Sequence, residues 1–332
     1  MAEKIINEQP LDNTVKELLL RVTGIKDGDF AQSENKTDKT TKKEIAFNIR
    51  QNGKAAKRSI TKNTSITTNE KTGALTIDVK PDTKMEFIYI PAIVTQSGMT
   101  DIANNDFFIG KNAHVTIVAG CAIHNTNNKR TEHKGQHRFF LEEGAHVTYL
   151  EKHYGQTHGN KHEGAILMNP QTEIHMNKNS SMQMDTQQIK GIDSTIRQTQ
   201  ATLQEGANLS VTEKIHTHKE QYAETSFTVD LNGKGSSVHV VSRSISSDKS
   251  YQKFISKIHG NTQCYGHVEC DGIIMDQGRV TAIPEITANS VDAELVHEAA
   301  IGKIAGAQLT KLMTLGLTEK EAEEQIIKGF LS

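Results

Sequence analysis

FFIGKNAHVTIV (107–118) and FFLEEGAHVTYL (139–150) are two copies of one pattern, an apolar strand followed by a turn and a second, alternating strand. ATLQEGANLSVTEK (201–214) and VDLNGKGSSVHVVSR (229–243) repeat it more loosely. The turns are separated by 34, 35, 27 and 27 residues, measured at Gly110, Gly144, Asn179, Gly206 and Gly233. Short strands at near-regular spacing, without helices between them, predict β-coils stacked on one another, with a flat β-sandwich as the alternative.

The composition favours a thin, repetitive core. Hydrophobic residues make up 35% of the 332 residues and aromatic residues 5%, with no tryptophan, and a solenoid layer needs only a few small or branched side chains. A net charge of −2 gives no overall attraction to nucleic acid. We see no membrane span, no apolar core of a secretory signal, and too few cysteines for a disulfide framework. We therefore expect a protein of the reducing cytoplasm.

Two flanking segments differ from the strand-rich centre. Residues 11–22, LDNTVKELLLRV, predict a short amphipathic helix, with Thr14 and Glu17 at the spacing of a capping box. Residues 27–43 are polar and predict a loop. The expected apolar face of the helix consists of Leu11, Val15, Leu18, Leu19 and Val22.

The C-terminal segment predicts helices from Asp292 to the end, with a second capping box at Thr318 and Glu321. So short a helical segment cannot bury enough surface to stand alone. We expect it to pack on the β body or on a partner.

Common catalytic motifs are missing from the sequence. It has no GxGxxG before a helix, no GxxxxGK[ST], no GxSxG and no CxxC. These absences disfavour nucleotide hydrolysis, dinucleotide binding and the common hydrolases. ATP chemistry would therefore have to come from a partner.

Histidines gather after the first cysteine. Seven of the 15 histidines fall between His124 and His162, directly after Cys121. On a strand, His133 and His137 would point to the same side. This segment is either a metal- or sulfur-handling face or a set of surface imidazoles in polar turns.

The other two cysteines lie near the C-terminal end. Cys264 and Cys270 are six residues apart and would share one face of a strand, and His297 and Glu298 follow. A lone buried cysteine is more often an inert small hydrophobe than a ligand. Three cysteines cannot supply the four thiolates of a stable cubane cluster. A site with one thiolate, an imidazole and a carboxylate would bind iron less firmly, which suits a protein that must hand its cluster on.

The stretch CDGIIMDQGRVTAIPEITANSVDAELVHEAAIGKIAGAQLTKLMTLGLTEKEAEEQIIKGFL (270–331) resembles the C-terminal core of the SufB/SufD family of iron–sulfur cluster assembly proteins. Upstream, AGCAIHN (119–125) and FFLEEGAHVTYLEKHYG (139–155) resemble a Gly-Cys segment and strand pair of that family. The resemblance covers roughly 85–332. The opening of the chain looks closest to short, single-component SufB-like proteins.

The resemblance implies a mainly β fold, a right-handed parallel β-helix flanked by helices. It divides the chain into an N-terminal segment (1–84), a β-helix core (85–290) and a C-terminal helical domain (291–332). It further implies a homodimer formed through the β-helix ends, with a SufC-type ABC ATPase docked on the C-terminal helices. The protein would be a scaffold for a transient iron–sulfur cluster and not an enzyme, and it would take sulfur from a donor and serve apo-protein acceptors.

The resemblance also implies roles for individual residues. The cluster-forming cysteine carries over to Cys270, and the accompanying histidine and glutamate carry over to His297 and Glu298. The upstream cysteine, which accepts sulfur and passes it along the β-helix interior, carries over to Cys121, with His133 as the matching histidine.

Two other functions compete with the scaffold. A zinc-binding structural protein would use the Cys121–His162 region. A polysaccharide-acting β-helix enzyme is disfavoured, because sugar sites use aromatic side chains and this chain has no tryptophan. The sequence leaves open the cluster type, the iron and sulfur donors, a heterodimer in place of a homodimer, and the role of Cys264.

Overall fold

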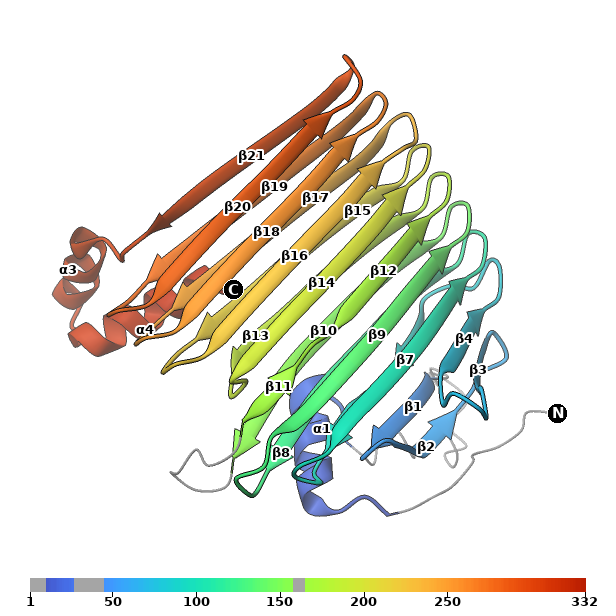
Figure 1. The fold of residues 1–332 in the computed structure, drawn as a ribbon, viewed down its shortest axis with the longest axis horizontal. Coiled ribbons are helices and arrows are strands. Elements are labelled where there is room, and N and C mark those ends of the chain that lie inside the picture. Colours follow the sequence, from blue (N-terminus) through green and yellow to red (C-terminus); the bar gives the residue numbers. More distant parts are fainter. Residues whose placement is uncertain (1–9, 27–44, 158–164) are drawn as a thin grey trace.

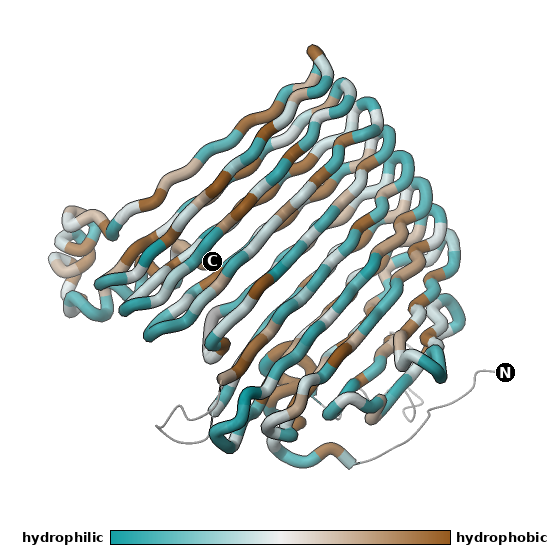
Figure 2. The backbone as a smooth tube through the Cα atoms, viewed as in Figure 1, coloured by the Kyte–Doolittle hydropathy of each residue, from teal (hydrophilic) through white to brown (hydrophobic). Residues whose placement is uncertain are grey.

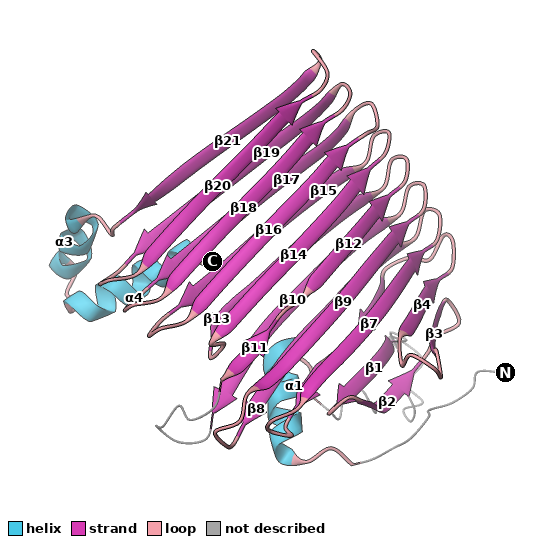
Figure 3. Cartoon of the chain, in the orientation of Figure 1, coloured by secondary structure: helices cyan, strands magenta, loops and turns pink. Residues whose placement is uncertain are grey.

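The computed structural model describes residues 10–26, 45–157 and 165–332. Strands make up 59% of the molecule and form a parallel β-solenoid of about 8 turns, with one short helix near the N-terminus and helices at the C-terminus (Figures 1 and 3). The mainly β fold predicted from the repeats is confirmed, and the flat sandwich is excluded. The loop predicted at 27–43 lies outside the described residues.

Two sheets form the walls of the solenoid, and from β7 (Thr100–Ile109) onward the chain passes back and forth between them (Figure 1). Sheet A has the order β2 (Lys54–Ser59), β1 (Ile45–Gln51), β5 (Glu86–Tyr89), β8 (His114–Asn125), β10 (His146–Thr157), β13 (Ser181–Lys190), β15 (Asn208–Thr217), β17 (Ser236–Ser246), β19 (Cys264–Ile274) and β21 (Ala293–Gly302), with β6 (Ala92–Val94) between β1 and β8. Sheet B has the order β20 (Arg279–Ala288), β18 (Tyr251–Gly260), β16 (Tyr222–Leu231), β14 (Ser194–Leu203), β11 (Ile166–Met168), β9 (Thr131–Leu141), β7 (Thr100–Ile109), β4 (Leu75–Val79) and β3 (Thr64–Thr68), with β12 (Gln171–Met176) between β14 and β9. Antiparallel pairs β1–β2 and β3–β4 lie at the N-terminal end.

Alternation along each strand builds the interior. Inward residues are buried and outward residues are more exposed, as in β14, where buried and accessible positions alternate. Figure 2 shows the same alternation as changes between hydrophobic and hydrophilic colour along the strands. The turns between strands hold residues with positive φ, a conformation that glycine and asparagine adopt at least cost. These turn residues include Asn112, Gly144, Asn179 and Gly206.

Helix α1 (Asn13–Thr23) covers the outer face of sheet A beside β8 and β10 (Figure 1). Its predicted apolar face is confirmed as buried. The predicted capping box is wrong, because the side chain of Asp12 caps the helix by accepting the Val15 N–H at 2.8 Å. Gly120 allows the close approach, since a Cβ there would lie 2.6 Å from Cβ of Val22.

The last turn of the solenoid extends further than the sequence suggested. The prediction of helix from Asp292 is wrong, because β21 pairs in parallel with β19 over ten residues before α3 (Gly306–Thr314) and α4 (Glu319–Phe330) begin. Pairing with the preceding turn overrides the local helix propensity of its Glu and Ala residues. The capping box of Thr318 and Glu321 at the start of α4 is confirmed. None of the helices in the described ranges is long and apolar enough to cross a membrane.

Candidate functional site

The interior of the solenoid is apolar toward one end of its strands and polar toward the other. The rings of Phe107 and Phe139 stack 4.5 Å apart on β7 and β9, whereas Asp101 and His133 occupy the same inward face six residues earlier. Buried polar groups cost stability unless they are paired, so a long run of them requires an explanation. We call this run the interior polar lane; it consists of Asp101, Cys121, His133, Glu151, His153, Thr186, Gln188, Arg197, Glu213, Thr225, Ser242 and Cys270.

One register row of sheet A, a line of residues paired side by side on neighbouring strands, is polar as far as Cys270. The row consists of inward residues in register on five successive strands, Glu151, Thr186, Glu213, Ser242 and Cys270. Neighbouring strands lie ~4.8 Å apart, so the row is about 20 Å long. One inward position further along β10, His153 is in register with Cys121 on one side and Gln188 on the other. The lane therefore runs continuously from one cysteine to the other.

Cys121 belongs to a buried Cys–His–Asp arrangement. Its sulfur lies 3.3 Å from Nε2 of His133, and Nδ1 of His133 donates to Oδ2 of Asp101 at 2.8 Å. Nε of Arg50 donates to the other oxygen of that carboxylate at 3.0 Å. The structure thus brings together the two residues that the sequence assigned to sulfur handling, and adds a carboxylate and a guanidinium that orient the imidazole.

These contacts make Cys121 an activated thiol. Burial alone would raise its pKa, but the charges and hydrogen bonds of His133 and then His153 outweigh burial and lower the pKa to about 7. Burial also opposes the charge on His133, yet the Cys121 thiolate and Asp101 raise the pKa of the imidazole above its ordinary value. At neutral pH about half of the Cys121 thiol is therefore ionised beside an imidazolium, and the thiolate is the nucleophilic form of cysteine.

Arg197 provides the positive charge in the middle of the lane. Its side chain, which is 2% exposed, pairs with Glu151 and lies 3.6 Å from Oε2 of Glu213. Its Nη2 lies 3.2 Å from Nδ1 of His153. Burial would raise the pKa of Glu151, but Arg197 and then His153 hold it well below its ordinary value. Burial prevails at Glu213, whose pKa is raised despite the same arginine.

A second histidine, His137, lies near Cys121 and belongs to the same strand as His133, β9. His137 contacts Tyr149, with 2.7 Å between Nδ1 and the phenol oxygen, and that phenol donates to Glu151 at 2.9 Å. Burial lowers the pKa of His137 to about 4, so its ring is neutral at physiological pH. Gly135 lies between the two histidines of β9, and a Cβ there would lie 3.3 Å from Nε2 of His133 and 3.7 Å from Nε2 of His137.

Cys270 ends the lane at the last turns of the solenoid. It is fully buried and in register with Ala299 of β21, so His297 lies on the same inward face one inward position earlier. Nε2 of His297 is buried and has no hydrogen-bond partner in the described chain. Glu298 points to the opposite face of β21, where its carboxylate lies 3.5 Å from Nε2 of His267. Within one chain the structure therefore groups Cys270 with His297 but not with Glu298.

The two C-terminal cysteines have different surroundings. Burial, followed by the charges of Glu213 and Asp271, raises the pKa of Cys270 to about 12, so its thiol is protonated in the isolated chain. Both thiols lie on the inward face and pack in the same apolar cluster, but Cys264 is in register with Ser236 and Ala293, which are outside the lane, and burial raises its pKa as well. Only Cys270 of this pair adjoins the polar lane.

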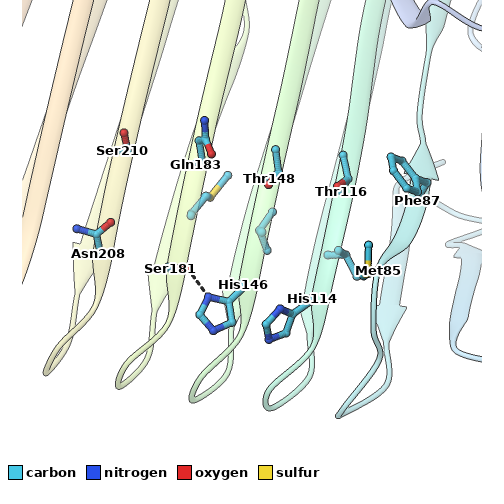
Figure 4. A pocket seen from close by; sticks show the side chains of 13 residues that line it. Met85, Phe87, His114, Thr116, His146, Thr148, Ser181, Gln183, Asn208 and Ser210 are labelled. Atoms are coloured by element: carbon cyan, nitrogen blue, oxygen red, sulfur yellow. Dashed lines mark hydrogen bonds between the residues drawn. The ribbon is translucent and has the colours of Figure 1, made fainter.

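Not every histidine of the 124–162 segment lies beside Cys121. His146 points outward and packs on His114 with ring centroids 4.2 Å apart, above a pocket of about 550 Å³ on the outer face of sheet A (Figure 4). His158 and His162 lie outside the described residues. No group of three or more His, Cys, Asp or Glu side chains in the described ranges could hold a metal ion, so the zinc alternative gains no support.

Comparison with known proteins decides the family. A family model described as the SUF system FeS cluster assembly, SufBD core domain, matches residues 92–330. The chain belongs to the SufBD family. The resemblance noted in the sequence is thereby confirmed, and the SufBD core covers the whole interior polar lane, whereas Arg50 and α1 precede it.

Several archaeal SufBD proteins are similar to this chain. An iron–sulfur cluster assembly SufBD family protein of Methanothermobacter thermautotrophicus is 29% identical over 235 residues, covering 69% of this chain and 55% of the relative. Relatives of the same description are 26% identical in Methanocaldococcus jannaschii, covering 72% and 74%, and 30% identical in Pyrococcus horikoshii, covering 67% and 66%. The match thus spans only about half the length of the Methanothermobacter protein. Family membership supports a role in iron–sulfur cluster assembly.

Reasoning from the sequence missed most of the lane. Glu151 and His153 follow Val147 and Tyr149 at successive inward positions of β10, a strand whose inward side the apolar pattern already indicated. Charged residues at inward positions were therefore a readable signal. The pairing of Asp101 with His133, or of Arg197 with Glu151, had no such signal.

Proposed function

We propose that this SufBD protein is a scaffold for de novo iron–sulfur cluster assembly. Sulfur enters at Cys121, passes along the interior polar lane, and meets iron at Cys270, from which the cluster is transferred to apo-proteins. The register row between Glu151 and Cys270 carries this proposal, because it joins an activated thiol to a second buried thiol. Polar atoms of the lane that have no hydrogen-bond partner among the described residues, such as Oγ1 of Thr186 and Oε1 of Gln188, are available to solvate a small passing sulfur species.

The cluster end of the lane supports assembly across a homodimer. β20 and β21 are the final strands of their sheets, and their outer edges are unpaired in the described chain. Exposed sheet edges favour pairing with another chain. We propose that a second copy covers this end, and that Cys270, His297 and Glu298 together bind iron there. Exposed apolar side chains at this end are Ile283, Ile286, Val291 and Ile301.

The C-terminal helices supply a surface for an ATPase. Met313 and Leu315, at and just after the end of α3, are 44% and 75% exposed, and α3 buries no residue fully. Such helices are stabilised by packing against a partner. We propose that a SufC-type ABC ATPase docks here and supplies the ATP chemistry, so that the scaffold itself is not an enzyme. Three free cysteines suit the reducing cytoplasm.

Replacing Cys270 with alanine is expected to abolish cluster formation. The experiment is anaerobic co-purification with the SufC-type ATPase of the same cell, followed by reconstitution with iron and sulfide and measurement of the cluster's visible absorbance. Cys264→Ala is the matched control, because that thiol is buried on the same strand face but is not in register with a residue of the lane. A full cluster in Cys270→Ala would move the ligand to another cysteine, and a wild-type complex without any cluster would refute the scaffold.

A further inference from the structure

We infer that the outer face of sheet A carries a binding site for Cu(I), formed by the imidazoles of His114 and His146 and the thioether of Met85. The site lies in the pocket of about 550 Å³ that Figure 4 shows. It is separate from Cys121 and Cys270, which are buried inside the solenoid, so the inference goes beyond the proposed scaffold function.

Stacking register brings the two histidines together. His114 of β8 and His146 of β10 are in register on adjacent strands, and both are exposed on the outer face. Their ring centroids lie 4.2 Å apart and their ring planes are tilted by 49°. Two imidazoles that bind one ion have centroids about 5 Å apart, because each ring nitrogen stands ~2.0 Å from the metal. A movement of about 1 Å by two exposed rings therefore makes them ligands of the same ion.

Both rings can present a lone pair to a metal. Partial burial, followed by the charges of His146 and Lys84, lowers the pKa of His114, so this imidazole is neutral at physiological pH. Nδ1 of His146 lies 2.5 Å from Oγ of Ser181 (Figure 4). When the Nδ1–H donates to this hydroxyl, Nε2 carries the lone pair. A hydrogen bond of this kind orients most metal-binding histidines.

Met85 supplies the third donor atom. The N–H of His114 donates to the carbonyl of Thr83 at 2.8 Å. Glu86 is in register with Val115, so Met85 lies beside His114. The side chain of Met85 lines the pocket with both histidines, and the residue is 75% exposed (Figure 4). Its φ of 54° is unfavourable for a residue with a side chain, and the fold gains no apolar burial in return. A metal ligand at this position would account for both features.

The donor set selects Cu(I). A thioether is a soft ligand that prefers Cu(I), whereas imidazole also accepts zinc, nickel and iron. The described residues that line the pocket include no aspartate or glutamate, so Mg²⁺ and Ca²⁺ lack their usual ligands there. The charge of Lys84 acts on His114, and this ammonium repels a divalent ion about twice as strongly as a monovalent one.

Methyl NMR of the full-length chain without oxygen tests the site, because the Met85 methyl group reports copper at its own sulfur. The nine methionines are labelled at their methyl groups, and the Met85 signal is assigned from Met85→Leu. Cu(I) is added as its acetonitrile complex up to four equivalents, one for the site and one for each of the three free thiols. We expect Cu(I) to move the Met85 signal, and a Cu(I) chelator to return it.

Variants of the two histidines show whether they share this ion. His114→Gln and His146→Gln should each weaken binding at Met85 by about 100-fold, read as the chelator concentration that returns the signal. His175→Gln is the matched control, because His175 is partly exposed on sheet B and contacts Glu173 at 2.6 Å. The exchanged histidines at 114 and 146 are exposed, so the variants should keep the circular dichroism of the wild type.

Each outcome decides the inference. A Met85 signal that moves with Cu(I) in wild type and in His175→Gln, but needs far more Cu(I) in His114→Gln and His146→Gln, supports the site. A Met85 signal unmoved by four equivalents overturns it and leaves the thiols as the copper ligands. A shift that persists unchanged in the chain with both histidines replaced also overturns it. None of these results bears on Cys121 or Cys270, so the scaffold proposal is tested separately.

Discussion

Replacing His133 with glutamine should lower the thiolate fraction of Cys121 at pH 7 by about 50-fold. In the wild-type protein the imidazolium of His133 opposes burial and helps to hold the pKa of Cys121 at about 7, so half of the thiol is ionised at that pH. Without this charge the pKa should rise to at least its ordinary value of 9.0, because burial is the largest influence on this thiol and only the smaller contribution of His153 then opposes it. Persulfide formation should fall in proportion, since the thiolate is the reacting species.

The measurement is the ultraviolet thiolate absorbance as a function of pH, in chains whose Cys264 and Cys270 are both changed to serine. In the wild-type background the absorbance should rise as pH increases through about 7, and in His133→Gln it should rise only at much higher pH. His146→Gln is the matched control, because that histidine faces solvent on the opposite side of β10. An unchanged titration in His133→Gln would show that this contact does not activate the thiol.

Replacing Arg197 with methionine should reduce the free energy of unfolding by about 3–5 kcal/mol. The substitution leaves the carboxylate of Glu151 buried without its main counter-charge. In wild type the pKa of Glu151 is depressed, so its contribution to stability is present at neutral pH and lost as pH falls through that depressed pKa. Without Arg197, burial raises the pKa of Glu151. The ionised carboxylate then destabilises the folded protein at neutral pH, and this destabilisation is relieved as the pH falls and Glu151 is protonated. The loss should therefore be smaller at about pH 4, where Glu151 of the variant is protonated, than at about pH 8.

Urea unfolding followed by circular dichroism at both pH values measures this effect. Arg138→Met is the control, because Arg138 pairs with Asp106 at a partly exposed site where a salt bridge contributes at most about 1 kcal/mol. A loss no larger than that of the control, or one that does not depend on pH, would mean that the charges of the lane are not coupled in the way the geometry indicates.

Reading the fold from the sequence succeeded where local pattern is enough. The paired copies at 107–118 and 139–150 predicted stacked β-coils, because alternation and turn residues are local properties. The same logic failed at β21, whose Glu- and Ala-rich sequence favours a helix in isolation. Its pairing with β19 holds it extended. The paired residues are 29 positions apart in the chain, so a local pattern does not indicate this pairing.

The site was harder to predict because it depends on stacking register. Cys121 and His133 were assigned through the family resemblance, and the structure brings them within 3.3 Å. Asp101 lies 32 residues from His133 and Arg197 lies 46 residues from Glu151, so each contact requires knowing which strands stack and how far the turns shift them. A change of one residue in any turn would send these side chains to the outer face.

The central claim, that sulfur travels inside the solenoid from Cys121 to Cys270, is tested most directly by a time course of isotopically labelled sulfur. The protein is charged briefly with labelled sodium disulfide, and mass spectrometry locates the label on each cysteine in wild type and in Cys121→Ala. The account predicts label first on Cys121 and later on Cys270, with none reaching Cys270 in Cys121→Ala. Label arriving on Cys270 equally fast in that variant would contradict it.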